Sequence, residues 1–532
     1  MTAVQSPPPP TADLEKLGLR PGATPAPEAD ADAPGSVGSW LRRRAASFAV
    51  LAPVLAVIGV VQVWGIGQFP ARFDDEGTYV AQAWAVQHLG QLGHYTYWYD
   101  HPPLGWIVLA LLGWPMHAFD GPGTAIAAGR ALLVPITLLT AALVYAFARR
   151  LGIRRVFAAL AVLAFGLSPL ALNYHRMVWL DNLAMPWLIG AFVLALTPGK
   201  RLWAYAGAGA CFAGAVLTKE TMLLMLPALA LAVWQSSASS TRRFCFAVFG
   251  ATFLLLVSIY PLYALIKGEL VPGPGHVSLL EGIKFQLSGR APSGSIFKSG
   301  TLSNYYVNGW LTLDRLLLGA GLAASLPALL SRRLRVPALA FLIQVLMMLR
   351  PGYLPAPYVI AMLPFAALLA AAAFDAVAGW RPNWPSPRFG IAGPVIASLA
   401  VVAAVVVAVP RWAREDRRQM TSNADQPMQT AAHWLQRHAG RQSRLLIDDT
   451  LWVDLVRDGF PRRNVVWYYK LGTDGMVDAA YPRGWRQFDY VVSSQMMRTD
   501  RTADVRAALR SSHLVAGFGK GTSRVEIRRV RG

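Results

Sequence analysis

The chain has 532 residues, of which 54% are hydrophobic and only 15% are charged, and its mean hydropathy is +0.37. Soluble domains carry about a quarter charged residues, so this composition excludes an ordinary soluble fold and indicates a polytopic membrane protein. The formal net charge of +21 does not indicate a nucleic-acid partner, because many of the basic residues stand in short clusters between apolar runs.

The first 38 residues are rich in Pro, Ala and acidic residues and contain little that a core would bury. Such a segment is predicted to be a disordered tail. It does not resemble a cleavable signal peptide, because the first apolar run begins only near Leu41 and has full spanning length. The positions of the basic clusters place this tail in the cytoplasm.

Basic clusters recur between the apolar runs, and this pattern follows the positive-inside rule. They lie at 41–44, 148–155, 199–201, 241–244 and 331–335, with Arg381 and Arg388 further on. The rule assigns these loops to the cytoplasm. The two cysteines, Cys211 and Cys245, lie in or beside apolar runs, so neither a disulfide framework nor a cysteine metal site is expected.

Apolar runs of about 20 residues, each long enough to cross a bilayer as a helix, predict about eleven spans. They lie near 45–66, 124–148, 156–172, 182–198, 202–218, 220–238, 244–266, 309–330, 336–350, 357–378 and 391–409. The run at 102–116 is short and begins with two prolines, so it is expected to lie along the outer interface as a half-buried helix. This choice keeps the cluster at 148–155 inside and puts the C-terminus outside.

The predicted organisation is therefore a transmembrane domain over 39–410, with outer loops at 67–123 and 267–308, and an extracytoplasmic soluble domain over 411–532. Three segments of the last domain are typical of short strands. Residues 425–440 are typical of a helix that starts near Asp425, and residues 516–530 are typical of a closing hairpin. This order predicts an α/β domain. It contains no glycine-rich phosphate loop, so nucleotide binding has no support.

Ionisable residues are rare in membrane segments and mark candidate functional sites. In the predicted topology, five segments that are distant in sequence bring such residues to the outer face. They are Asp75 and Glu76, Asp100 and His101, Arg176 and Asp181, Lys219 and Glu220, and Arg350 with Tyr353. Their convergence predicts one site that contains both carboxylates and cations.

The motifs that carry these residues resemble the membrane glycosyltransferases of the type-C fold. "DDEGTYVAQAW" at 74–84, "YDHPPLG" at 99–105 and "RMVWLDNLAMP" at 176–186 follow one another, and a lysine ends a later span. More narrowly, they are similar to the branch that includes protein O-mannosyltransferases and the lipid A aminoarabinose transferase. The resemblance covers most of the first 380 residues. It implies transfer of a single sugar from a polyprenyl-phosphate donor to an acceptor hydroxyl on the outer side, with inversion at the anomeric carbon.

The resemblance also implies roles for individual residues. Asp75 and Glu76 form the matched catalytic pair, with Asp75 as the base, and Asp74 lies outside that pair. The cations and polar groups that would bind the donor phosphate are His101, Lys219, Arg350, Tyr353 and Arg176. Asp100 and Asp181 would hold Mg²⁺ or Mn²⁺, which prefer oxygen ligands. This chain has His101 where some relatives have lysine.

Several of these candidate site residues also have a purely structural explanation. The acidic pair would be a solvated turn before an interfacial helix, Asp100 a helix cap, and Asp181 a partner of Arg176. Lys219 and Arg350 would extend to the membrane interface. His276 and Arg290 in the loop 267–308 are weaker candidates for contact with the acceptor.

Other functions remain open at this point. The main alternative is a transporter or a flippase of lipid-linked sugars, and a second is a ligase that transfers a complete glycan. A third alternative makes the C-terminal domain a binding module that recruits protein or cell-wall acceptors, and this is compatible with the glycosyltransferase hypothesis. The expected partners are the membrane, a polyprenyl-phosphate sugar lipid and a protein, lipid or glycan acceptor. The sequence specifies neither the sugar nor the acceptor.

Overall fold

The computed structural model describes residues 37–199, 201–350, 352–379, 392–500 and 502–531. The predicted tail up to residue 36 lies outside these residues, as do Lys200, Arg381 and Arg388 of the basic clusters. By its contacts the chain divides into two compact units, Met1–Ala49 and Val50–Gly532. The larger unit contains all the candidate site residues.

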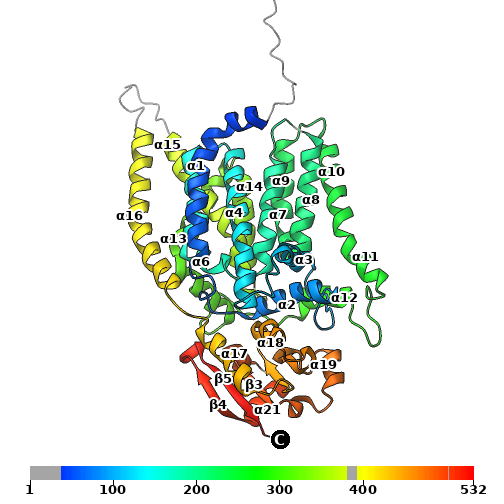
Figure 1. Cartoon of the computed structure of the whole chain (residues 1–532). Coiled ribbons are helices and arrows are strands. Elements are labelled where there is room, and N and C mark those ends of the chain that lie inside the picture. The colour runs from blue at the N-terminus through cyan, green and yellow to red at the C-terminus, as the bar shows by residue number, and fades with distance from the viewer. Residues whose placement is uncertain (1–36, 200, 351, 380–391, 501, 532) are drawn as a thin grey trace, which may run out of the picture. The chain divides into compact units, whose positions relative to one another are not determined.

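Helices form nearly all of the described chain up to residue 420 (Figure 1). Within the described ranges, six helical segments are long and apolar enough to cross a membrane: Ala45–Val63, Ala125–Arg150, Arg242–Ile266, Leu302–Leu330, Ala356–Gly379 and Val395–Met420. They correspond to α1 (Val37–Val63), α4 (Ala125–Arg150), α10 (Arg242–Val257) with α11 (Ile259–Ile266), α13 (Leu302–Leu330), α15 (Leu363–Gly379) and α16 (Ala392–Met420). The polytopic helical fold is confirmed, and the number of eleven spans stays a prediction.

The remaining predicted spans are shorter or broken. They contain α5 (Arg155–Leu167), α6 (Pro169–His175), α7 (Leu180–Ala195), α8 (Leu202–Thr218), α9 (Leu226–Ser236) and α14 (Arg335–Leu349). The predicted span 156–172 bends by 60° between α5 and α6. Pro169 lacks the N–H that would continue the helix, and Ser168 instead caps α6 by accepting a hydrogen bond from the N–H of Ala171.

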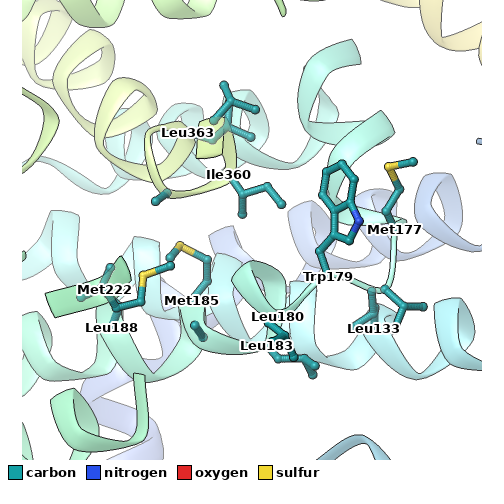
Figure 2. Close-up of a cluster of buried hydrophobic side chains, with 14 of the residues drawn as sticks. Leu133, Met177, Trp179, Leu180, Leu183, Met185, Leu188, Met222, Ile360 and Leu363 are labelled. Atoms are coloured by element: carbon teal, nitrogen blue, oxygen red, sulfur yellow. The ribbon is translucent and has the colours of Figure 1, made fainter. Parts of the chain in front are cut away.

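The helices pack through both large and small side chains. Figure 2 shows large apolar side chains of α7, among them Leu183 and Leu188, in one buried cluster with Met222 and Ile360. Between α8 and α10 the backbones approach closely, because a Cβ on Gly209 would lie only 2.3 Å from the carbonyl oxygen of Phe249. Small residues permit this kind of contact between helices in membranes.

Two of the predicted cytoplasmic loops meet at one carboxylate. Arg154, between α4 and α5, and Arg333, between α13 and α14, form ion pairs of 2.7 Å and 2.8 Å with Asp375 near the end of α15. Two basic clusters distant in sequence therefore lie at the same end of the bundle, as the positive-inside pattern requires.

The loop predicted over 67–123 contains two helices, α2 (Asp74–Leu89) and α3 (Leu104–Gly113). Gly90 ends α2 in the left-handed conformation (φ 62°), which glycine adopts without strain. On α3, Trp106 and Leu109 are buried whereas Leu111 is exposed. This helix is thus half-buried, and its predicted position along the membrane interface stays a prediction.

Residues after Met420 form the predicted α/β domain. Its five strands are β1 (Leu445–Ile447), β2 (Val465–Trp467), β3 (Tyr490–Ser493), β4 (Ser512–Phe518) and β5 (Val525–Val530). Their order in the sheet is β2-β1-β3-β5-β4. β1 pairs in parallel with β2 and β3, and β5 is antiparallel to β3 and β4, so the last two strands form the expected hairpin.

Helices complete this domain: α17 (Gln426–His438), α18 (Trp452–Arg457), α19 (Gly475–Ala480), α20 (Gln495–Thr499) and α21 (Ala503–Arg510). The segment after Ile447 had the apolar pattern of a strand but forms a helical turn instead. Asp448 accepts hydrogen bonds from the N–H and hydroxyl of Thr450, and this local cap ends β1. Figure 1 shows the domain at the end of the bundle where α2 and α12 (Leu279–Lys284) lie.

Candidate active site

A cavity of about 980 Å³ opens between the helical bundle and the C-terminal domain. Seven of the ten residues whose convergence the sequence predicted line it: Asp75, Asp100, His101, Lys219, Glu220, Arg350 and Tyr353. Arg290, one of the two weaker candidates, lines it as well. Glu76, Arg176 and Asp181 do not. The predicted convergence of distant charged segments is therefore present in the structure, although three of its members lie elsewhere.

Asp75 reaches the cavity from the first turn of α2. Thr78 follows three residues later on the same helical face and also lines the cavity. Gly77 lies between them, and a Cβ there would come within 2.3 Å of the backbone of Asp449 in the C-terminal domain. The absence of a side chain at Gly77 thus lets α2 lie directly on that domain while Asp75 faces the cavity.

Glu76 points away from the cavity into a buried ion pair. Its oxygens accept hydrogen bonds from Arg130 Nε at 2.8 Å and Nη2 at 2.6 Å. They also accept from the N–H groups of Val178 at 3.0 Å and Phe73 at 3.2 Å. The side chains of Glu76 and Arg130 are 0% and 1% exposed. This geometry favours a structural role for Glu76, which fixes the start of α2, over the predicted catalytic one.

The turn that carries Asp100 and His101 is held by tyrosines. The hydroxyl groups of Tyr97 and Tyr260 donate to the carbonyl oxygen of His101 at 2.8 Å and 3.2 Å. Gln286 donates to the carbonyl oxygen of Asp100 at 2.6 Å. Tyr99 adopts a positive φ of 57°, and this turn of the backbone directs the next two side chains to the cavity. The aromatic residues at 95–99 thus shape this turn.

Lys219, His101 and Glu220 form a hydrogen-bonded chain. Lys219 Nζ lies 3.1 Å from His101 Nε2, and His101 Nδ1 lies 2.9 Å from Glu220 Oε2. An ammonium group only donates, so Nε2 accepts from Lys219 and Nδ1–H donates to Glu220. α8 ends at Thr218 and Lys219 is extended, and this conformation turns its side chain toward His101. The chain fixes the ammonium of Lys219 at the cavity wall.

Further cations come from the loop before α13 and the end of α14. The guanidinium carbon of Arg290 lies 4.6 Å from the ring centroid of Tyr353, in cation–π geometry. Arg350 is exposed at the cavity wall. Arg290 was only a weak candidate by sequence, because nothing in its local pattern separates it from other loop arginines. His276, the other weak candidate, lies outside the cavity and contacts the carbonyl of Val271.

Arg176 and Asp181 are buried and do not line the cavity. Arg176 donates to the carbonyl oxygens of Val61 and Trp64, near the end of α1, and so closes a helix terminus. Asp181 is 3% exposed, and its Oδ2 has no hydrogen-bond partner among the described residues. No ion pair joins the two side chains in the described part of the chain. The predicted phosphate contact of Arg176 therefore has no support in its position.

The predicted divalent cation was assigned to Asp100 and Asp181. Asp100 lines the cavity whereas Asp181 does not. Across the described ranges, no group of three or more His, Cys, Asp or Glu side chains is placed to hold a metal ion. Asp100 and Asp181 therefore do not form a metal site built from protein ligands. None of the proposed chemical steps depends on a metal ion.

The C-terminal domain supplies one wall of the cavity. This wall contains Trp467, Tyr468, Tyr469, Lys470, Met496, Thr499 and Asp500. Sequence reasoning missed these residues because they belong to a separate domain without a catalytic motif, and only its docking on α2 brings them to the cavity. Thr78 of α2 forms hydrogen bonds with this domain. Its Oγ1 lies 2.5 Å from Asp449 Oδ2 and 2.7 Å from the hydroxyl of Tyr469.

Buried aromatic rings complete the docking surface. The ring of His94 lies 3.7 Å, centroid to centroid, from that of Trp452 and 4.1 Å from that of Tyr95. The hydroxyl of Tyr95 accepts a hydrogen bond from the N–H of Trp467 at 3.1 Å. Burial lowers the pKa of His94 well below its usual value of 6.5, and the neighbouring charges of Arg462 and Lys470 act in the same direction. His94 is thus harder to protonate in the folded protein than in the unfolded chain.

Comparison with known proteins agrees with this architecture. Residues 100–263 match the family model described as dolichyl-phosphate-mannose-protein mannosyltransferase. No protein of curated function matches the chain in sequence. Among the solved structures that are similar in fold over most of the chain are those of two proteins.

ArnT from Cupriavidus metallidurans matches at a TM-score of 0.58 and 15% identity, over 91% of this chain and 98% of its own. The same protein bound to undecaprenyl phosphate gives the same TM-score and identity, over 90% and 98%. The oligosaccharyltransferase of Archaeoglobus fulgidus matches at a TM-score of 0.52 and 14% identity, over 88% and 72%. The predicted resemblance is confirmed: the chain has the type-C fold of membrane glycosyltransferases.

Proposed function

We propose that this protein is an inverting glycosyltransferase that moves a single sugar from a polyprenyl-phosphate donor to an acceptor hydroxyl at the outer face of the membrane. The observation that carries the proposal is the arrangement of the cavity. It places a carboxylate, Asp75, in the same enclosed space as the Lys219–His101–Glu220 chain and two arginines.

Asp75 is the proposed base. An acceptor hydroxyl is a weak nucleophile until a positioned carboxylate removes its proton. As Asp75 takes that proton, the acceptor oxygen forms a bond to the anomeric carbon, and the bond from that carbon to the phosphate oxygen breaks. Attack from the side opposite the leaving group inverts the anomeric centre, and the electron pair leaves with the polyprenyl phosphate.

The cations of the cavity are the proposed phosphate site. Negative charge grows on the leaving phosphate in the transition state, and fixed cations in a partly enclosed site stabilise it. Lys219 is 5% exposed and is held by His101, so its ammonium is already oriented before the donor binds. Arg350 and Arg290 also line the cavity and supply further positive charge. We assign His101 to position Lys219 and Tyr353 to position Arg290.

Apolar side chains at the cavity wall suit a lipid donor. Leu223, Leu287 and Leu302 line the cavity and are themselves 47%, 80% and 46% exposed. A polyprenyl chain would cover this surface and gain roughly 25 cal/mol for each Å² of apolar area removed from water. The structure of ArnT bound to undecaprenyl phosphate supports a lipid-linked donor, as does the description of the matching family model.

The proposed orientation has the N-terminus in the cytoplasm and the cavity outside. The ion pairs of Arg154 and Arg333 with Asp375 support it, because they gather two basic loops at one end of the bundle. The C-terminal domain lines the cavity, and it would then be extracytoplasmic. No observation on the described residues supports the alternative of a transporter or flippase.

The test is transfer of radiolabelled sugar from a panel of synthetic polyprenyl-phosphate sugars, with water included as an acceptor. We expect purified wild type to consume one donor and Asp75→Asn to lose at least about a hundredfold in rate, which is typical of the loss of a general base. Asp120→Asn is the matched control, because Asp120 is an exposed carboxylate of the same loop outside the cavity. Equal rates for Asp75→Asn and wild type, in protein of unchanged thermal stability, would contradict the proposal.

Assays with and without EDTA separate metal use from the protein chemistry. The proposed steps need no metal, so we expect EDTA to leave the wild-type rate within about twofold, since all the required charge comes from side chains. A loss of turnover that added Mg²⁺ or Mn²⁺ restores would show that a divalent cation takes part, and would contradict the proposal that side chains supply all the required charge.

A further inference from the structure

The two walls of the cavity differ in chemistry. Besides the proposed base and phosphate site, the wall from the helical bundle carries apolar side chains, among them Leu223, Leu224, Leu287, Met347 and Leu354. The opposite side is formed by the loop before α3 and the C-terminal domain. It carries aromatic and polar side chains, and we call five of these the acceptor wall: Trp98, Tyr469, Lys470, Thr499 and Asp500. The apolar wall suits a lipid chain, so the acceptor wall faces the other substrate.

Lys470 and Trp98 are fixed together on this wall. The ammonium of Lys470 lies 4.4 Å from the ring centroid of Trp98 and 3.7 Å from Asp474 Oδ2. Asp474 in turn accepts hydrogen bonds from Trp98 Nε1 at 3.0 Å and Thr96 Oγ1 at 3.3 Å. The side chain of Asp474 is fully buried, and that of Lys470 is 14% exposed. A buried carboxylate thus presents an aromatic ring and a cation as one preformed surface.

The acceptor wall adjoins the proposed base. Tyr469 contacts Thr78 through its hydroxyl at 2.7 Å, and Thr78 lies three residues from Asp75 on the same face of α2. Successive turns of a helix are about 5 Å apart. The acceptor wall therefore meets α2 about one helical turn from Asp75.

We propose that the acceptor wall binds a neutral saccharide and that a hydroxyl of this saccharide is the acceptor. This inference rests on the proposed function. Aromatic rings beside a few placed polar groups are the usual lining of a site for a small polar ligand. The wall carries one cation, one carboxylate and two hydroxyl groups. Both hydroxyl groups already make hydrogen bonds within the protein, and their oxygen atoms can still accept one from a ligand. Together with the ammonium and the carboxylate they match the alternating donors and acceptors of a sugar without a net charge.

The acceptor role balances the reaction described above. The saccharide O–H bond breaks, its proton moves to Asp75, and its oxygen forms the new glycosidic bond as the polyprenyl phosphate leaves. The apolar wall is occupied by the donor chain during this step. A lipid acceptor would therefore have to place a second chain against a polar surface, which is unfavourable.

The experiment measures transfer by the full-length protein in detergent, with the donor identified by the panel above. The acceptors are neutral oligosaccharides, an oligosaccharide with a carboxylate, a Ser/Thr peptide, a lipid-linked sugar and water. Two variants change the acceptor wall, Lys470→Gln and Thr499→Val. The matched control is Lys520→Gln, because Lys520 is an exposed lysine of the same domain outside the cavity.

We expect a neutral oligosaccharide to be the best acceptor. Lys470→Gln should raise its KM about tenfold, as the loss of one charge-assisted hydrogen bond predicts, with a donor KM within about twofold of wild type. Thr499→Val should raise the acceptor KM less, and Lys520→Gln should leave both values unchanged. If Lys470→Gln fails to fold, Thr499→Val gives the same comparison with a smaller change of volume.

Two results would overturn this inference and leave the proposed function standing. One is transfer to the peptide or the lipid but to no saccharide, or hydrolysis of the donor without any transfer. The other is an acceptor KM that neither variant changes, or a donor KM that rises instead. No turnover of any donor, even with water as acceptor, would contradict the proposed function itself.

Discussion

Arg72 and Asp425 lie 353 residues apart in sequence and form a buried ion pair, with Nε 2.8 Å from Oδ1. Arg72 precedes the helix that carries Asp75, and Asp425 stands at the start of the C-terminal domain. Asp454 of the same domain also pairs with Arg72, at 3.2 Å. The C-terminal domain is therefore tied to the segment that presents the proposed base, and it takes part in the site rather than only recruiting an acceptor.

The first prediction concerns this ion pair. Arg72→Met leaves Asp425 buried without the cation that it contacts and leaves Asp454 with Arg457 at 3.5 Å. The loss of one partner of a buried pair typically costs about 3–5 kcal/mol. We expect a lower thermal midpoint and faster proteolysis between α16 and α17. Arg437→Met is the control, because Arg437 is an exposed arginine of α17. Equal unfolding curves for Arg72→Met and wild type would show that the pair does not hold the domain in place.

The second prediction tests the contact at Gly77. A Cβ there would lie 2.3 Å from the backbone of both Asp449 and Thr450, and backbone does not yield as a flexible side chain does. Gly77→Ala should therefore destabilise docking by about 1–3 kcal/mol or more and reduce transfer. Gly250→Ala in α10 should be silent, because a Cβ there has open space. The contact is unimportant if both variants transfer sugar at the wild-type rate.

The third prediction is a pH dependence that His94 introduces. Its folded pKa is depressed below 6.5, so the unfolded chain binds a proton that the folded chain does not. Above pH 6.5 the ring is neutral in both the folded and the unfolded chain, so it adds no pH dependence to the free energy of unfolding. Below pH 6.5 the unfolded chain takes up the proton, and the free energy of unfolding falls by at most about 1.4 kcal/mol per pH unit. Urea unfolding of wild type and His94→Phe between pH 5 and 8 measures this difference.

His94→Phe keeps a ring between Trp452 and Tyr95 but cannot take up a proton, so its stability should depend less on pH over this range. Other groups of the interface titrate in both proteins, and the comparison removes their contribution. Parallel pH curves for the two proteins would mean that His94 is not the source of the dependence.

The sequence predicted the fold class and much of the cavity for definite physical reasons. Long apolar runs between basic clusters can satisfy their backbone only as helices in a membrane, so the bundle follows from composition and spacing. Asp75, His101 and Lys219 stood in motifs whose order matched the type-C glycosyltransferases. Pro169 is itself a signal in the sequence for the break between α5 and α6, but the predicted span 156–172 continued through it.

The sequence could not separate residues that line the cavity from neighbours that are buried for structural reasons. Asp75 and Glu76 are adjacent acids in one motif, yet successive helical residues point about 100° apart. One therefore faces the cavity and the other faces Arg130. The wall containing Lys470 was missed because its position depends on docking between domains, and local patterns carry no information about that contact.

The last prediction separates the two adjacent acids. Glu76→Gln removes the charge that balances the buried guanidinium of Arg130, so it should lower the thermal midpoint strongly, as expected for about 3–5 kcal/mol of lost stability. Asp75→Asn should keep the wild-type midpoint and lose transfer, because Asp75 faces the cavity. Thermal unfolding and donor turnover, measured on the same preparations, give both values for each variant. If Glu76→Gln is as stable as wild type but inactive, then Glu76 acts in catalysis as its motif predicted and the structural assignment of its ion pair is wrong.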